Sequence, residues 1–125
     1  MMHPTLHSDL EWRIMKYLWQ EERASIRNVW EALFPEGEKA YTTVQTYMER
    51  MVEKGLLTKE KIGMVNFYSP AVSEEETLAR ATDSFVKKVF NGSFGLLAAF
   101  LVDSDKLDNS DREELRKLIE QHSKE

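Results

Sequence analysis

The chain has 125 residues and a formal net charge of −5, and its 42% hydrophobic and 31% charged residues are typical of a globular protein, not a disordered one. It contains no cysteine, which excludes a disulfide framework, a zinc ribbon and thiol chemistry. Residues 1–70 are nearly neutral, and most of the acidic excess lies in residues 71–125. Any nucleic-acid binding by the first half must therefore depend on a local arrangement of cations.

Two helices are predicted at the start of the chain. Ser8 and Glu11 have the spacing of a capping box, and apolar residues with a helical period follow them. After a polar turn, Ser25 begins a second, shorter helix that reaches about Leu33. The sequence Phe34–Gly37 then ends it.

The third predicted helix covers residues 40–55 and has an unusual first turn. Thr42 or Thr43 can cap it, and Gly55 ends it. Its apolar residues share one face: Val44, Tyr47, Met48, Met51 and Val52. The opposite face begins with threonine and glutamine, whose short polar groups can hydrogen-bond base edges and phosphates in a major groove. Taken alone, this pattern is more typical of threonines that serve only as capping and spacer residues.

After the third helix the periodicity becomes strand-like. Residues 56–61 and 65–70 each predict a strand, with a turn at Gly63 between them and Pro70 at the end. Three helices followed by a two-stranded hairpin predict a winged helix-turn-helix, in which the third helix enters the major groove. Winged helices also serve as protein-interaction modules without DNA contact, and this alternative stays open.

The second half predicts three more helices. Ser73 caps a helix that extends to about Phe90, a short apolar helix spans Ser93 to Val102, and Ser110 opens the last one. The predicted fold class is therefore mainly α with a small β-hairpin. Residues 1–72 are expected to form a winged-helix DNA-binding domain, and residues 73–125 a helical dimerisation domain.

The apolar faces of these last helices predict self-association. About fifty residues are too few to bury three such faces internally, so a second copy is expected to cover them. The alternative is that these helices fold back on the first domain. The residues expected at the dimer interface are Phe85, Val89, Phe90, Phe94, Leu97, Ala98, Phe100, Leu101, Leu107, Leu115, Leu118 and Ile119.

Several blocks of sequence carry a family resemblance. They include AYTTVQT at 40–46, MVEKGLL at 51–57, YSP at 68–70, FNGS at 90–93 and LLAAF at 96–100. In this order, and with further matches across residues 8–120, they resemble the penicillinase-repressor family, the BlaI/MecI/CopY-like transcriptional regulators of bacteria. The resemblance implies a homodimeric repressor that binds palindromic promoter sites built on TACA/TGTA half-sites.

The resemblance also implies roles for individual residues. The base-reading positions would be Thr42, Thr43, Gln45 and Thr46, and Arg50 would face the DNA backbone. Glutamine matches adenine geometrically, and a threonine methyl can contact thymine. Two further groups of contacts are expected, at the start of the second helix and on the wing: Ser25, Arg27, Lys59, Lys61 and Asn66.

Three features depart from the family pattern. Family wings often carry arginine near the turn, whereas residues 62–65 here read IGMV. Repressors cleaved by a membrane sensor protease carry an Asn-Phe bond, and the nearest match is Ala99–Phe100. Cleavage at this bond, and a sensor protease as partner, therefore lack their usual sequence support. The copper-responsive mechanism requires carboxy-terminal cysteines and is excluded. The inducing signal stays open.

Other chemistry has little support in the sequence. His3 and His7 flank Pro4 without further ligands, no nucleophile–His–acid set stands out, and no cofactor motif is present. We therefore expect neither a metal site nor an enzyme. The longest apolar run is Phe94–Val102, which is shorter than the about 20 residues of a membrane span, and the amino terminus lacks a signal-peptide pattern. A cytoplasmic protein without membrane insertion is expected.

Overall fold

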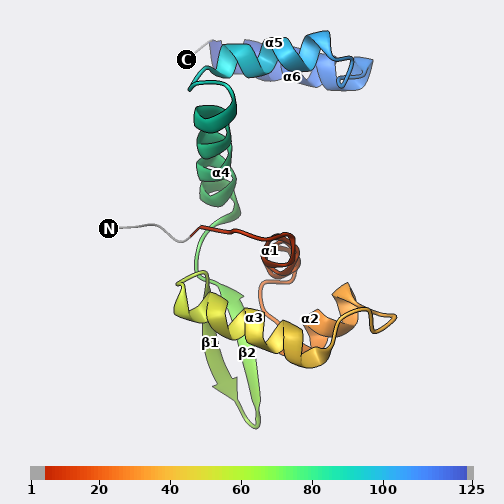
Figure 1. The fold of residues 1–125 in the computed structure, drawn as a ribbon, viewed down its shortest axis with the longest axis vertical. Coiled ribbons are helices and arrows are strands. Elements are labelled where there is room, and N and C mark those ends of the chain that lie inside the picture. The colour runs from red at the N-terminus through yellow and green to blue at the C-terminus, as the bar shows by residue number, and fades with distance from the viewer. Residues whose placement is uncertain (1–4, 124–125) are drawn as a thin grey trace. The chain divides into compact units, whose positions relative to one another are not determined.

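The computed structural model describes residues 5–123, which form two compact units, one ending at Ala81 and the other beginning at Thr82. The first contains α1 (Asp9–Glu21), α2 (Ile26–Leu33), α3 (Tyr41–Glu53), β1 (Leu57–Ile62) and β2 (Val65–Pro70) (Figure 1). Helix α4 (Glu74–Val89) begins in this unit and ends in the second, which also holds α5 (Phe94–Asp103) and α6 (Asn109–Ser123). The mainly helical fold with one β-hairpin is thus confirmed. The boundary between the units falls within α4, later than the expected division after residue 72.

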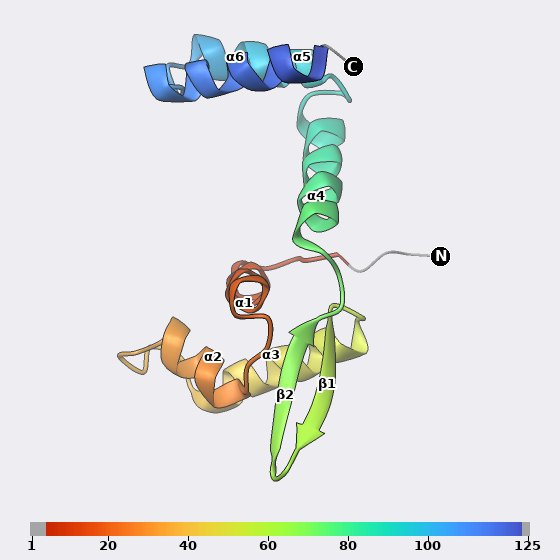
Figure 2. The ribbon, with the colours of Figure 1, turned by 180° about the vertical axis from the view of Figure 1, so that it is seen from behind.

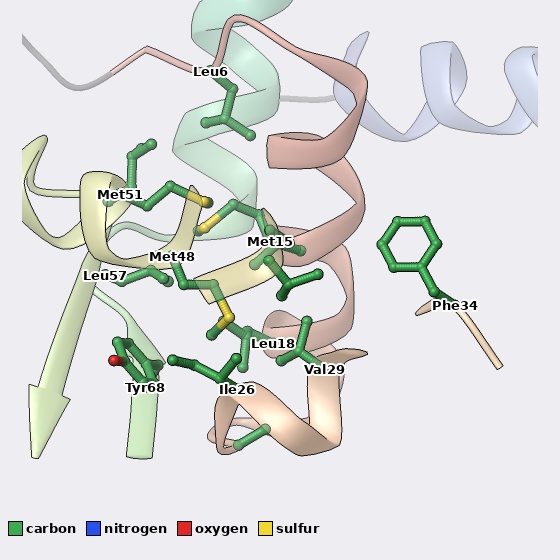
Figure 3. Close-up of a cluster of buried hydrophobic side chains, with 14 residues drawn as sticks. Leu6, Met15, Leu18, Ile26, Val29, Phe34, Met48, Met51, Leu57 and Tyr68 are labelled. Atoms are coloured by element: carbon green, nitrogen blue, oxygen red, sulfur yellow. The ribbon is translucent and has the colours of Figure 1, made fainter. Parts of the chain in front are cut away.

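The core of the first unit joins its three helices to the hairpin (Figure 3). Its buried side chains come from every one of these elements and from the loops between them: Leu6, Ile14, Met15, Leu18, Ala24, Ile26, Val29, Phe34, Val44, Met48, Met51, Leu56, Leu57 and Tyr68. Three of the five apolar residues predicted on α3 are fully buried, namely Val44, Met48 and Met51. Their burial fixes the rotation of α3 and leaves its polar face outward.

The two ends of α3 are built differently. At the start, Ala40 is the N-cap and no side chain caps the helix, so the prediction that Thr42 or Thr43 caps it is wrong. At the end, the Gly55 amide donates to the Val52 carbonyl, and the next amide, of Leu56, donates to the Met51 carbonyl. Gly55 has a φ of 84°, which glycine adopts without the steric cost of a Cβ. The predicted glycine stop is therefore confirmed.

A buried ion pair connects α1 to the end of α3. Glu11 is 6% exposed, and its carboxylate accepts hydrogen bonds from the Lys54 ammonium and the His7 amide, both at 2.7 Å. Ser8 caps α1 as predicted, because its hydroxyl accepts from the Glu11 amide at 3.2 Å. The Glu11 side chain thus ties the carboxyl end of α3 to the first turn of α1.

The wing is an antiparallel hairpin whose register places opposite residues on one face. Lys59 pairs with Tyr68 and Lys61 pairs with Asn66, and Gly63 turns the chain at a φ of 65°. Figure 2 shows β1 and β2 side by side. Tyr68 also exchanges two backbone hydrogen bonds with Ala24, at 2.8 and 3.1 Å. The loop between α1 and α2 therefore holds the wing beside the helices. The first strand begins one residue later than predicted.

In the second unit, α5 and α6 run alongside each other. The ring of Phe90, just after α4, contacts those of Phe85 and Phe100 at centroid distances of 5.8 and 5.9 Å. Helix α6 begins at Asn109, not at the predicted Ser110, because Asp108 and Asp111 exchange hydrogen bonds between side chain and backbone. Within residues 5–123, no single helix has the length and apolar character to cross a membrane. Taken together, α4 and α5 have the length and composition of a membrane span, but the pair is bent by 83°.

Candidate nucleic-acid interface

The exposed face of α3 carries the predicted base-reading residues together with Arg50. Thr42, Thr46 and Arg50 are exposed, whereas Thr43 and Gln45 are half-buried. Residues four apart lie above one another on a helix, so Tyr41, Gln45 and Glu49 form one row along α3. This row borders the wing. The Thr46 hydroxyl donates to the Thr42 carbonyl at 2.9 Å, so only its methyl group and its lone pairs are available to a ligand.

A hollow of about 370 Å³ opens between the wing, α3 and the start of α2. It is lined by Ser25, Ile26, Arg27, Tyr41, Gln45, Glu49, Met64, Val65, Asn66 and Tyr68. We call it the wing hollow. Four of the predicted contacts, Ser25, Arg27, Gln45 and Asn66, meet here although they come from three separate elements. A second, shallower hollow is lined by Thr42, Thr43, Thr46 and Tyr47.

The start of α2 presents backbone amides and one arginine. The Ser25 hydroxyl accepts from the Asn28 amide at 3.1 Å, and the Asn28 side chain accepts from the Ser25 amide at 3.4 Å. This confirms that Ser25 caps the helix. Arg27 lies 5.7 Å from the centre of the Tyr41 ring and forms an exposed ion pair with Glu31 at 3.4 Å. Such a pair contributes little to stability, so Arg27 can exchange it for a phosphate at small cost.

The wing offers two lysines that share the face of Tyr68 and Asn66. Lys59 and Lys61 are both exposed, and the register places them opposite those two residues. The tip is apolar, as Ile62, Met64 and Val65 are all exposed and Met64 is 92% exposed. The cationic part of the wing therefore lies along its strands and not at its turn.

Six residues that line the wing hollow were not assigned to the interface from the sequence: Ile26, Tyr41, Glu49, Met64, Val65 and Tyr68. The ring of Tyr68 is fully buried. Its hydroxyl, however, has no hydrogen-bond partner within residues 5–123. Burial raises the pKa of Tyr68, and the nearby Glu49 carboxylate raises that pKa further. The four-residue spacing of Gln45 and Glu49 is the sequence signal that could have identified Glu49.

The residues predicted at the dimer interface lie in the second unit, and many of them are exposed. Phe85, Val89, Phe94, Phe100, Leu115, Leu118 and Ile119 have exposures between 43% and 66%, and so do Leu96 and Val102, which were not predicted. Leu97, Ala98, Leu101 and Leu107 line an apolar groove between α5 and α6. Ala99 and Phe100 lie within α5, so the bond between them is helical. Among residues 5–123, no cluster of three or more His, Asp or Glu could hold a metal. His3 lies outside the described residues.

Residues 7–121 match the penicillinase repressor family. The chain is 27% identical to the methicillin resistance regulatory protein MecI of Staphylococcus aureus, over 90% of this chain and 91% of that one. It is also 27% identical to the penicillinase repressor of Bacillus licheniformis, over 92% of this chain and 90% of that one.

Two solved structures resemble the first unit. The DNA-binding domain of the repressor BlaI has a TM-score of 0.53, and the monomeric Bacillus licheniformis BlaI in complex with the blaP half-operator has one of 0.51. Each is 29% identical to this chain and covers 61% of it and 93% of its own length. The winged-helix geometry and the match over nearly the whole sequence lead to one conclusion: the chain belongs to the penicillinase repressor family.

Proposed function

We propose that this DNA-binding repressor acts as a homodimer that occupies a palindromic operator and so blocks a promoter. The observation that carries the proposal is the exposed, uncharged polar face of α3, bordered by a wing hollow in which Gln45 and Asn66 meet. Relatives support it, because a BlaI structure was solved with a half-operator. The mechanism is binding and not catalysis.

In this proposal each part of the interface has a separate task. Thr42, Thr43, Gln45 and Thr46 read base edges in the major groove, since amides and hydroxyls of this size reach hydrogen-bonding atoms there. Arg50, Lys59 and Lys61 hold the phosphate backbone, together with Ser25 and Arg27 at the start of α2. Base contacts set the sequence preference, and phosphate contacts set the register and the salt dependence.

The second unit supports the homodimer. Val89, Phe100 and Ile119 are 56%, 55% and 66% exposed, and monomeric proteins rarely leave contiguous apolar surface of this kind open to water. A second copy covers such surface with a matching one, because a two-fold interface is self-complementary. Two-fold symmetry would also present two α3 helices to the two halves of a palindrome, preferably with TACA/TGTA-type half-sites.

The signal that releases the DNA is a separate question. A membrane sensor protease that cuts at Ala99–Phe100 would have to unwind α5 first, because the bond is helical. The asparagine that such cleavage favours is absent, so we do not assign release to this bond. The proposed site of action is the cytoplasm, where the operator is.

One observation favours a different function. The apolar wing tip, with Met64 92% exposed, is more typical of a surface that binds another protein than of one that binds DNA phosphates. In that case the wing would bind another protein, and α3 would not contact DNA. The two functions differ in their response to substitutions on α3.

Two variants test the proposal on an operator duplex and a scrambled duplex. Gln45→Ala should weaken operator binding by about 1–3 kcal/mol and change scrambled binding little, because it removes a base contact. Arg50→Ala should weaken both alike and lower the slope of log K against log salt by about one. If both variants bind both duplexes as the wild type does, α3 does not read DNA, and the protein-interaction alternative gains support.

A further inference from the structure

Glu49 occupies an unexpected place for an acid on a DNA-reading surface. It lies one turn after Gln45 on α3, it is exposed, and it lines the wing hollow together with Gln45 and Asn66. Within residues 5–123 its carboxylate has neither an ion pair nor a hydrogen bond. An exposed carboxylate facing phosphates weakens DNA binding at every sequence, since like charges repel. The Glu49 carboxylate therefore lowers the affinity for DNA unless it also makes a favourable contact there.

The floor of the same hollow points to a missing partner. The Tyr68 hydroxyl is fully buried and has no hydrogen-bond partner among the described residues, whereas buried polar groups in proteins are nearly always paired. It lies near enough to Glu49 for that carboxylate to raise the pKa of Tyr68, yet no hydrogen bond joins the two groups. A hydroxyl and a carboxylate that have no hydrogen-bond partner among the described residues thus line one hollow, and both suit a polar ligand.

The chemistry of the carboxylate selects the kind of ligand. A carboxylate accepts hydrogen bonds and cannot donate them, so it can pair with the exocyclic amino group of a base but not with a phosphate. Glutamate and aspartate accept from N4 of cytosine in the major groove, whereas glutamine matches adenine. Guanine and thymine offer acceptors at the same edge, and a carboxylate would repel them.

We propose that Glu49 is a specificity-determining residue that accepts a hydrogen bond from the N4 amino group of a cytosine beside the base read by Gln45. This inference rests on the proposed function, because it requires α3 to lie in a major groove. Repulsion between the Glu49 carboxylate and the phosphates lowers the affinity for every sequence, and the cytosine contact restores the affinity for the operator. The residue thereby widens the gap between operator and other DNA.

The experiment uses the full chain and an operator obtained by selection from random duplexes. Each cytosine in a half-site is replaced in turn by a pyrimidinone that lacks the 4-amino group, and binding is measured by fluorescence anisotropy. For the wild type, one such replacement should weaken binding about tenfold. In Glu49→Ala the same replacement should have no effect, because the acceptor is gone. Glu53→Ala, at an exposed acid beyond the hollow, should retain the wild-type sensitivity.

Two outcomes would overturn the inference. One is a Glu49→Ala variant that binds operator and scrambled duplexes more tightly by the same factor, which would assign Glu49 to general repulsion only. The other is a variant that remains as sensitive as the wild type to the missing amino group. Because wild-type preference for the operator is measured in the same series, failure of the repressor function itself would be recognised separately. Circular dichroism of both variants checks that α3 is intact.

Discussion

The ion pair between Glu11 and Lys54 gives a quantitative test of how α3 is held in place. We consider Glu11→Gln, which keeps an acceptor for the His7 amide but removes the negative charge. A hydrogen bond to a charged group contributes about 1.5–3 kcal/mol. The Lys54 side chain is 34% exposed, so solvent screening reduces its share to about 1 kcal/mol. We expect the substitution to lower the free energy of unfolding by about 1–2 kcal/mol near neutral pH.

The pH dependence provides the sharper part of this test. Burial raises the pKa of Glu11, but hydrogen bonds from the His7 amide and from Lys54 outweigh it, and the pKa lies below its ordinary value of 4.5. Because the pKa is lower in the folded state than in the unfolded state, the carboxylate stabilises the fold above pH 4.5. That stabilisation is lost as the pH falls through the folded-state pKa.

Urea unfolding of wild type and Glu11→Gln, at one protomer concentration, measures the difference in their free energies of unfolding. It should be present near pH 7 and shrink as the pH falls below 4.5, the ordinary pKa of a glutamate. Glu53→Gln, at an exposed position on α3, is the matched control and should change the unfolding free energy by under about 0.5 kcal/mol. A Glu11→Gln effect of equal size near pH 7 and below pH 4.5 would mean that the charge of Glu11 does not stabilise the fold.

Three further predictions concern the wing and the second unit. Tyr68→Phe removes a hydroxyl that has no partner among residues 5–123, so the urea midpoint should stay equal or rise. A loss above about 1 kcal/mol of unfolding free energy would mean that the hydroxyl has a partner. Lys61→Ala should weaken operator and scrambled duplexes alike and lower the salt slope by about one, whereas an unchanged slope would remove Lys61 from the phosphate contacts. Ile119→Asp should shift sedimentation toward the monomer, because it places an unpaired charge in the proposed interface, while Lys117→Asp should leave the proposed dimer intact. Equal behaviour of these two variants would place the interface elsewhere.

The sequence predicted the order of elements because its periodicities are strong and its end signals are local. Ser25 and Gly55 mark helix ends through bonds within a few residues, and both were identified correctly. A competing local pattern caused the error at the start of the last helix. At the last helix, Asp108 and Ser110 each begin a plausible cap, and the exchange between Asp108 and Asp111 decides the start.

What the sequence could not predict are the contacts between distant residues. Glu11 has the spacing of a capping glutamate, yet it pairs with Lys54, 43 positions later. The Tyr68 hydroxyl, which lacks a partner among the described residues, lines a hollow that exists only when α3 and the wing are brought together. Only the fold shows that Glu49 shares a hollow with Gln45 and Asn66.

The most direct test of the central claim is a salt-dependent fluorescence-anisotropy titration with stoichiometry, on a TACA/TGTA palindrome and a scrambled duplex. A homodimeric repressor should bind with two chains per palindrome, roughly 10³-fold or more tighter than to scrambled DNA. Its affinity for both duplexes should fall as salt rises. Equal and weak binding to both, followed by failure of a random-sequence selection to enrich any palindrome, would contradict the repressor function.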